Sequence, residues 1–158
     1  MGQPELHPDL SLLRGLVGTW TGTGEGSYPT IEPFTYHETS VFSHVGKPFL
    51  AYVQRTTSPD GLPRHTESGY LRMPEAPGVE LVIAHPTGHV EVGAGTVSGG
   101  LIVVRSTSVT ATPSAKSVVA VERELALDGD VLRYVIRMAA VGQPMTHHLA
   151  AELRRVPA

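Results

Sequence analysis

Histidine is the residue type in this sequence that is best suited to metal chemistry. The chain holds eight His and no Cys among its 158 residues. Thiolate ligands, iron–sulfur clusters and disulfides are therefore excluded. Any transition metal, or any cofactor that contains one, would have to be bound through imidazole. The position of each histidine along the chain decides which of them can serve in that way.

Two histidines flank the turn HPTGH at 85–89. A separation of four residues brings two imidazoles together on a helix, but Pro86 and Gly88 indicate a hairpin turn here. The rings of His85 and His89 need not converge across such a turn. We therefore predict no metal site at this place.

Three further histidines give weaker indications. Strand alternation places His37 and His44 on opposite faces, so at most one of them faces an interior. His65 begins a predicted strand near Glu67 and is interpreted as a polar surface residue. None of the three is a candidate ligand on this basis.

The segment MTHHLAAELRR at 145–155 places a His doublet in a predicted strand. Alternation assigns one set of side chains to an apolar face that could pack against an N-terminal helix: Met145, His147, Leu149, Ala151 and Leu153. It assigns the other set to the interior: Thr146, His148, Ala150 and Glu152. An imidazole between small residues leaves space for a bulky planar ligand. A core histidine without a ligand remains the alternative for His148.

Other kinds of chemistry find little support. The stretch GTGEG at 22–26 resembles a phosphate-binding loop, but neither a helix nor Gly-Lys-Ser/Thr follows it. No nucleophile elbow is present, and triads or carboxylate pairs cannot be inferred from sequence order. The net charge of −3 argues against nucleic-acid binding, which requires clustered positive charge.

The sequence gives no indication of membrane insertion or export. It contains no run of eighteen apolar residues, and its N-terminus MGQPELHPDL lacks the basic and apolar regions of a signal peptide. The lack of Cys fits a reducing compartment. We expect a cytoplasmic protein that binds small molecules, and neither membranes nor nucleic acids.

The elements that must position these residues are nearly all strands. One helix is predicted over 8–18, where apolar residues share a face: Leu10, Leu13, Leu16 and Val17. Alternating runs and Gly, Pro or Asp turns predict ten strands, at 19–28, 34–45, 49–57, 64–73, 79–85, 89–97, 101–109, 116–127, 131–140 and 144–155. Short connections favour an all-β fold, a ten-stranded antiparallel up-and-down barrel of the calycin or lipocalin type with a short N-terminal helix. We expect a single domain over 1–158.

The first strand carries glycine at alternate positions, with one tryptophan in the series: Gly18, Trp20, Gly22, Gly24 and Gly26. Without Cβ atoms, the strand can bend sharply and lie close to another wall. Trp20 is interpreted as a core residue that plugs the closed end of the barrel. Ten tilted strands enclose more volume than their side chains fill, which leaves space for a ligand.

Several motifs, taken in order, resemble those of the nitrobindin family of small haem-binding β-barrels. The first, Gly18-Thr19-Trp20-Thr21-Gly22-Thr23-Gly24, is similar to the family signature Gly-x-Trp-x-Gly-x-Gly. The others extend the resemblance over nearly the whole chain: Tyr28-Pro29-Thr30-Ile31, Pro33-Phe34-x-Tyr36, VGKPFL at 45–50, ESGYLR at 67–72, VELVIAHPTG at 79–88, AKSV at 115–118 and HLAAEL at 148–153.

The resemblance implies a barrel that binds haem b, with His148 as the proximal axial ligand of the iron. His147 is the neighbouring alternative, but motif alignment and face parity both select His148. Lys116 matches the Lys of Ala-Lys-x-Val and is implied to pair with a haem propionate. Thr30 is implied to lie at the haem.

The activity implied by the resemblance is isomerisation of peroxynitrite to nitrate at a ferric haem, with reversible binding of nitric oxide. No catalytic residue beyond the haem iron is implied, and we expect a largely apolar distal side. A haem carrier or nitric oxide sensor without catalysis is one alternative. A metal-free lipocalin-like or fatty-acid-binding-like carrier of a small apolar ligand is another. The expectations also allow for a homodimer.

Overall fold

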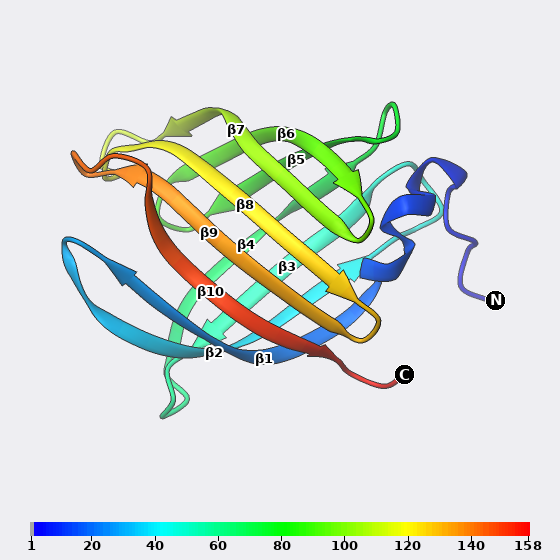
Figure 1. The fold of residues 1–158 in the computed structure, drawn as a ribbon, viewed down its shortest axis with the longest axis horizontal. Coiled ribbons are helices and arrows are strands. Elements are labelled where there is room, and N and C mark those ends of the chain that lie inside the picture. Colours follow the sequence, from blue (N-terminus) through cyan, green and yellow to red (C-terminus); the bar gives the residue numbers. More distant parts are fainter. Residues whose placement is uncertain (1) are drawn as a thin grey trace.

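Ten strands and one short helix make up the computed structural model, which describes residues 2–158 (Figure 1). The helix is η1 (Pro8–Leu16). The strands are β1 (Gly18–Tyr28), β2 (Ile31–Ser43), β3 (Leu50–Thr57), β4 (Pro63–Arg72), β5 (Gly78–His85), β6 (His89–Ser98), β7 (Leu101–Ala111), β8 (Val118–Asp128), β9 (Val131–Ala140) and β10 (Thr146–Arg155). All ten predicted strands are present.

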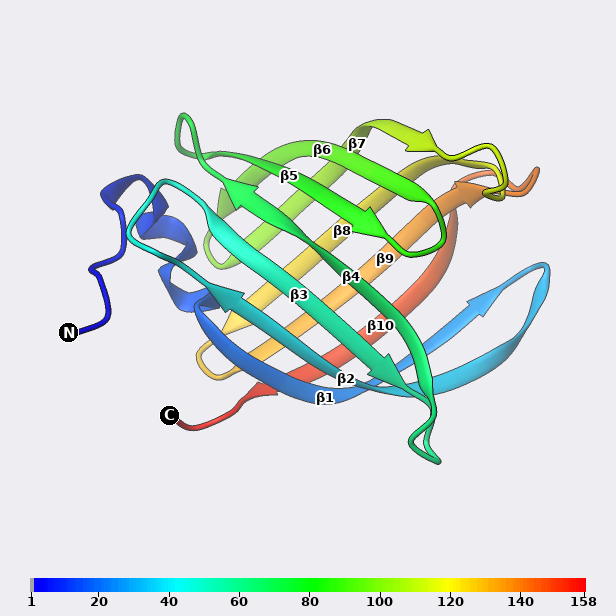
Figure 2. The same cartoon turned by 180° about the vertical axis from the view of Figure 1, so that it is seen from behind.

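The strands form one closed antiparallel barrel, which confirms the predicted fold class. Each strand pairs with its neighbours in sequence, and β1 also pairs with β10, from Trp20 opposite Arg155 to Gly26 opposite Leu149. Closure of the sheet in this way satisfies the hydrogen-bonding groups of its edge strands. Figures 1 and 2 show that η1 and both termini lie at one end, while the β1–β2 and β9–β10 connections lie at the other.

The helix η1 covers one end of the barrel. It is a 3-10 helix whose Leu10, Leu13 and Leu16 are buried against the strands. The indole of Trp20 is fully buried and donates a hydrogen bond from Nε1 to the carbonyl oxygen of Leu16, over 2.8 Å. The guanidinium of Arg155 lies 4.3 Å from the centroid of the same ring. Trp20 therefore links the helix to the first and last strands.

The glycines of β1 are sites where other groups occupy the space of a side chain. A Cβ on Gly22 would lie 2.0 Å from the backbone oxygen of Glu152 on β10. A Cβ on Gly24 would lie 2.3 Å from Cζ of Tyr36 on β2. The missing side chains thus permit the close approach that the glycine pattern predicts, by backbone in one case and by an aromatic ring in the other.

We expect Gly24→Ala to lower the free energy of unfolding by about 3 kcal/mol, the upper end of the usual cost of overpacking. The ring of Tyr36 cannot easily move aside, because its hydroxyl lies 2.6 Å from that of buried Tyr134 in a hydrogen bond. Urea unfolding measures the effect. The control is the exposed neighbour Thr23, since Thr23→Ala should cost no more than about 1 kcal/mol. Equal losses in the two variants would contradict this account of Gly24.

On β3 and β4, the buried side chains change from apolar to polar along the barrel axis. On β4, buried Leu71 lies toward the helix end and buried Glu67 lies farther from it. On β3, buried Leu50 lies toward the helix end and buried Gln54 lies farther from it. Ionisable side chains therefore gather toward the end away from η1. Within residues 2–158, no helix has the length and apolar character needed to cross a membrane.

Candidate functional site

The end of the barrel away from the helix contains a cavity of about 840 Å³. Three residues that the sequence analysis singled out line it: Thr30 follows β1, Lys116 lies between β7 and β8, and His148 lies on β10. Apolar side chains form much of the remaining wall, among them Val109, Val118, Ile136, Met138 and Leu149. The fold therefore brings the three residues to one cavity from distant parts of the chain.

The ring of His148 is half-buried and held in one orientation. Its Nδ1 lies 3.2 Å from the backbone oxygen of Ser27, and because a carbonyl oxygen can only accept, Nδ1 carries the proton. The rings of Tyr28 and Phe34 meet it edge-on, with centroids 5.5 and 6.5 Å away. Burial lowers the pKa of His148, which favours the neutral ring. The lone pair of Nε2 is then free to bind a metal.

A β-bulge determines where His148 points, and strict alternation was therefore wrong about its neighbours. The register of β10 against β9 shifts between His147 and Leu149, which makes His148 the extra residue. Beyond the bulge, Leu153 is buried in the core, whereas Glu152 is exposed. Glu152, predicted to share the interior face of His148, thus lies outside. Bulges of this kind commonly redirect a side chain at a functional site.

Lys116 and Thr30 are exposed residues at the rim of the cavity. The backbone of Lys116 is held by buried His89, whose Nε2 donates to the Lys116 carbonyl oxygen over 2.7 Å. The Nδ1 of His89 accepts from the hydroxyl of Thr87 over 2.9 Å. The lysine thereby places an ammonium group beside the opening, where it suits an anionic group of a ligand.

A buried charged cluster lines the same cavity, and the sequence analysis missed it. The guanidinium of Arg123 donates to Oε1 of Glu67 and to Oε2 of Glu91, each over 2.8 Å. Burial by itself would raise the pKa of both carboxyl groups, but Arg123 and the neighbouring histidines, His65 and His85 at Glu67 and His85 at Glu91, together outweigh burial and lower the pKa of each. Both are therefore carboxylates at neutral pH. This part of the cavity is therefore lined by charged side chains.

Two histidines extend this cluster. Nε2 of His65 lies 3.4 Å from Oε2 of Glu67, and Nε2 of His85 lies 3.2 Å from Oε2 of Glu91. His65 was interpreted as a surface residue, but it lines the cavity and only 35% of its side chain is exposed. His85 and His89 contact different partners, as the hairpin turn between them predicts. The two-residue spacing of His65 and Glu67 on β4 was the signal that could have revealed the cluster.

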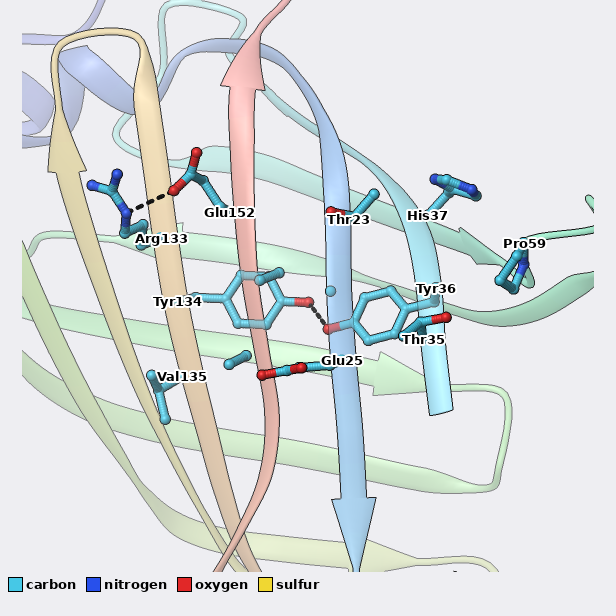
Figure 3. Close-up of a pocket in the computed structure, with 13 residues that line it drawn as sticks. Thr23, Glu25, Thr35, Tyr36, His37, Pro59, Arg133, Tyr134, Val135 and Glu152 are labelled. Carbon is cyan, nitrogen blue, oxygen red and sulfur yellow. Dashed lines mark hydrogen bonds and ion pairs between the residues drawn. The ribbon is translucent and has the colours of Figure 1, made fainter. Parts of the chain in front are cut away.

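A second depression, of about 620 Å³, lies over β1, β2, β9 and β10 (Figure 3). Figure 3 shows the hydroxyl groups of Tyr36 and Tyr134 meeting behind β1, where Gly24 provides the space. Burial raises the pKa of both phenols, so they stay protonated at neutral pH. His148, Lys116 and Thr30 line the other cavity, which we therefore take as the candidate site.

The inner cavity is suited to a haem on several grounds. Its volume lies in the upper part of the range of small-molecule sites, about 300–1,000 Å³. Its wall combines apolar side chains with a neutral imidazole, that of His148, whose Nε2 is free to ligate iron. The ammonium group of Lys116 at the rim suits a propionate.

Comparisons with known proteins point the same way. Residues 9–155 match the family described as "THAP4-like, heme-binding beta-barrel domain". A protein named peroxynitrite isomerase 1 from Mycolicibacterium paratuberculosis is 56% identical over 156 residues, which cover 96% of this chain and 97% of that protein. One named peroxynitrite isomerase from Nocardia farcinica is 51% identical over 155 residues, covering 95% and 92%. The crystal structure of Rv2717c from M. tuberculosis, 48% identical, matches with a TM-score of 0.92 and covers 97% of this chain and 100% of that one. The chain thus belongs to the family of THAP4-like, haem-binding β-barrel domains.

Proposed function

We propose that this protein binds haem b in its inner cavity through Nε2 of His148 and isomerises peroxynitrite to nitrate at the ferric haem. The observation that carries the proposal is the neutral His148 ring, oriented by Ser27 and lining a largely apolar cavity. The names of the relatives at 56% and 51% identity support the reaction. Reversible binding of nitric oxide belongs to the same proposal, because His148 would be the one side chain that ligates the iron and a haem held in this way would supply a binding site for a small molecule.

The protein's part in this function is to hold and orient the cofactor. The backbone oxygen of Ser27 keeps Nδ1 of His148 protonated, so that Nε2 would be the neutral ligand of the iron. The hydroxyl of Tyr28 accepts from the backbone N–H of Ala140 and donates to the oxygen of Met138, both over 3.0 Å. These bonds join β1 to β9 beside the His148 ring and stabilise the wall against which the ring packs.

The reaction places few demands on side chains. Peroxynitrite and nitrate contain the same atoms and carry the same charge, so the conversion requires no net proton transfer and no reductant. When bound, a ferric haem supplies a Lewis-acidic iron that can accept the anion. We therefore assign no catalytic residue beyond the iron, and assign His148, Lys116 and Thr30 to binding of the cofactor. The single domain over 1–158, the cytoplasmic location and the homodimer stay predictions from the sequence.

Lys116→Met should weaken the affinity for hemin about two- to fivefold, as expected for the loss of one exposed ion pair. Titration of hemin-free protein, followed by absorbance, measures the affinity. The difference from the wild type should shrink at high salt, because exposed charges are screened. Lys47→Met is the matched control, since Lys47 is also exposed but lies in the β2–β3 connection. An equal loss of affinity in both variants would contradict a local role for Lys116.

Stopped-flow decay of peroxynitrite tests the proposed activity. Protein loaded with hemin should accelerate the decay beyond an equal concentration of free hemin, whereas hemin-free protein should not. If hemin-loaded protein is no faster than free hemin, the enzymatic proposal is wrong, and a haem carrier or sensor remains. If hemin does not bind and an apolar ligand does, a carrier of the lipocalin type remains.

A further inference from the structure

Three metal-binding atoms lie close together on β4 and β5, one of them on a buried residue and two on half-buried residues. They are Nε2 of His65, Oε2 of Glu67 and Nδ1 of His85. The two nitrogens lie 3.4 Å apart. Oε2 of Glu67 lies 3.4 Å from the His65 nitrogen and 3.3 Å from the His85 nitrogen. The three atoms therefore form a nearly equilateral triangle.

The size of this triangle matches tetrahedral coordination. Bonds from zinc to imidazole nitrogen or carboxylate oxygen are about 2.0–2.2 Å long. At a tetrahedral angle, two such ligand atoms lie about 3.3–3.6 Å apart, whereas at the right angles of an octahedron they lie about 2.8–3.1 Å apart. The observed separations of 3.3 to 3.4 Å fall in the tetrahedral range. Two histidines and one glutamate also form the ligand set of several catalytic zinc sites, which keep a fourth position open.

The groups around the triangle hold its ligands in place. Arg123 donates to both oxygens of Glu67, over 2.8 Å to Oε1 and over 3.3 Å to Oε2, and so fixes the carboxylate with Oε2 facing the two imidazoles. Nε2 of His85 lies 3.2 Å from Oε2 of Glu91, so a carboxylate can accept the proton of the ring nitrogen that does not face the triangle. Such carboxylate–histidine–metal arrangements orient the ligand and increase its basicity.

Charge and ligand type both favour a transition-metal cation. One guanidinium, that of Arg123, faces two carboxylates, those of Glu67 and Glu91, and this leaves one negative charge in a buried region. A divalent cation with one anionic ligand in the fourth position would bring the sum to zero. Imidazole ligands select zinc, copper, iron or nickel over magnesium and calcium.

We propose that His65, Glu67 and His85 form a second metal site, a tetrahedral site for a divalent ion of the zinc type that is distinct from His148. All three side chains line the inner cavity, so water or a small anion can reach the fourth position. The site requires no haem, and it therefore goes beyond the proposed function.

Titration of full-length, hemin-free and chelator-treated protein with Co²⁺ tests the site. Tetrahedral Co²⁺ has intense visible absorption bands, whereas octahedral Co²⁺ is nearly colourless. We expect one equivalent of Co²⁺ to produce the intense bands and Zn²⁺ to displace it. Loss of an outer-shell partner typically weakens metal binding about 10–100-fold, so His65→Ala and His85→Ala should weaken it about 100-fold or more.

Two histidine variants outside the cluster are controls. His37 is exposed on β2 and His148 is the proposed haem ligand, so His37→Ala and His148→Ala should bind Co²⁺ as the wild type does. Weak, octahedral-type spectra of the wild-type protein would overturn the proposal, as would full binding by folded His65→Ala. Circular dichroism establishes that each variant is folded. Because hemin is left out, the result does not depend on whether the proposed haem function is correct.

Discussion

Hemin bound to His148→Ala should lack the Soret band of histidine-ligated ferric haem, and its affinity should fall by about 100-fold or more. The reason is that Nε2 of His148 is the protein atom proposed to bind the iron. The wall of the cavity alone can retain hemin only through apolar contacts and Lys116. Absorbance titration of hemin-free wild type and variant measures both the spectrum and the affinity.

The adjacent histidine provides the matched control. His147 is exposed and precedes the bulge that turns His148 into the cavity, so His147→Ala should bind hemin as the wild type does. Free imidazole added to His148→Ala should restore the spectrum, because the removed ring leaves space beside Ser27 and Tyr28. An unchanged spectrum in His148→Ala, or its loss in His147→Ala, would contradict the assignment of the ligand.

Arg123→Met should destabilise the barrel by about 3–5 kcal/mol, the usual cost of removing one partner from a buried ion pair. Arg123 is 7% exposed, and its single positive charge is shared by the carboxylates of Glu67 and Glu91, residues that are 4% and 2% exposed. Without it, Glu67 and Glu91 would repel each other in the interior or take up protons. Urea unfolding of hemin-free protein at neutral pH measures the loss.

Two further variants separate charge from packing. Arg105 forms an exposed pair with Glu122, 72% of the arginine side chain being exposed, so Arg105→Met should cost no more than about 1 kcal/mol. Combining Arg123→Met with Glu67→Gln and Glu91→Gln should recover part of the stability, because the unpaired charges are then absent. A cost below about 1 kcal/mol for Arg123→Met alone would show that the cluster does not depend on this charge.

The strands were predictable because their signals are local. Each strand can be placed within a short window of sequence, because its side chains alternate and turn residues such as the Gly of DGD at 128–130 bound it. Ten such strands in a meander form a closed barrel most simply, because closure leaves no edge strand unpaired. The helix was also predictable, because Leu10, Leu13 and Leu16 share one face at helical spacing. All three are buried in the structure. The resemblance to the nitrobindins, carried by motifs along the whole chain, was confirmed by the family match and by the relatives.

The interior of the site was less predictable, because its parts come from different strands. A single extra residue in β10, at His148, reverses the alternation that follows it, and nothing in THHLAAE marks the bulge. The charged cluster requires β4, β5, β6 and β8 to face one another across the closed barrel, and its ion pairs join residues such as Glu67 and Arg123, which are far apart in sequence. His65 and Glu67 lie two residues apart on one strand and so share a face, but the burial of that face is evident only in three dimensions.

The central claim is that haem on His148 converts peroxynitrite to nitrate, and product analysis under turnover tests it most directly. Hemin-loaded wild-type protein, supplied with many equivalents of peroxynitrite, should form nitrate as fast as peroxynitrite disappears, and faster than free hemin at the same concentration. His148→Ala with hemin should not exceed free hemin. Nitrate formation by the loaded wild type at the rate of free hemin would contradict the claim.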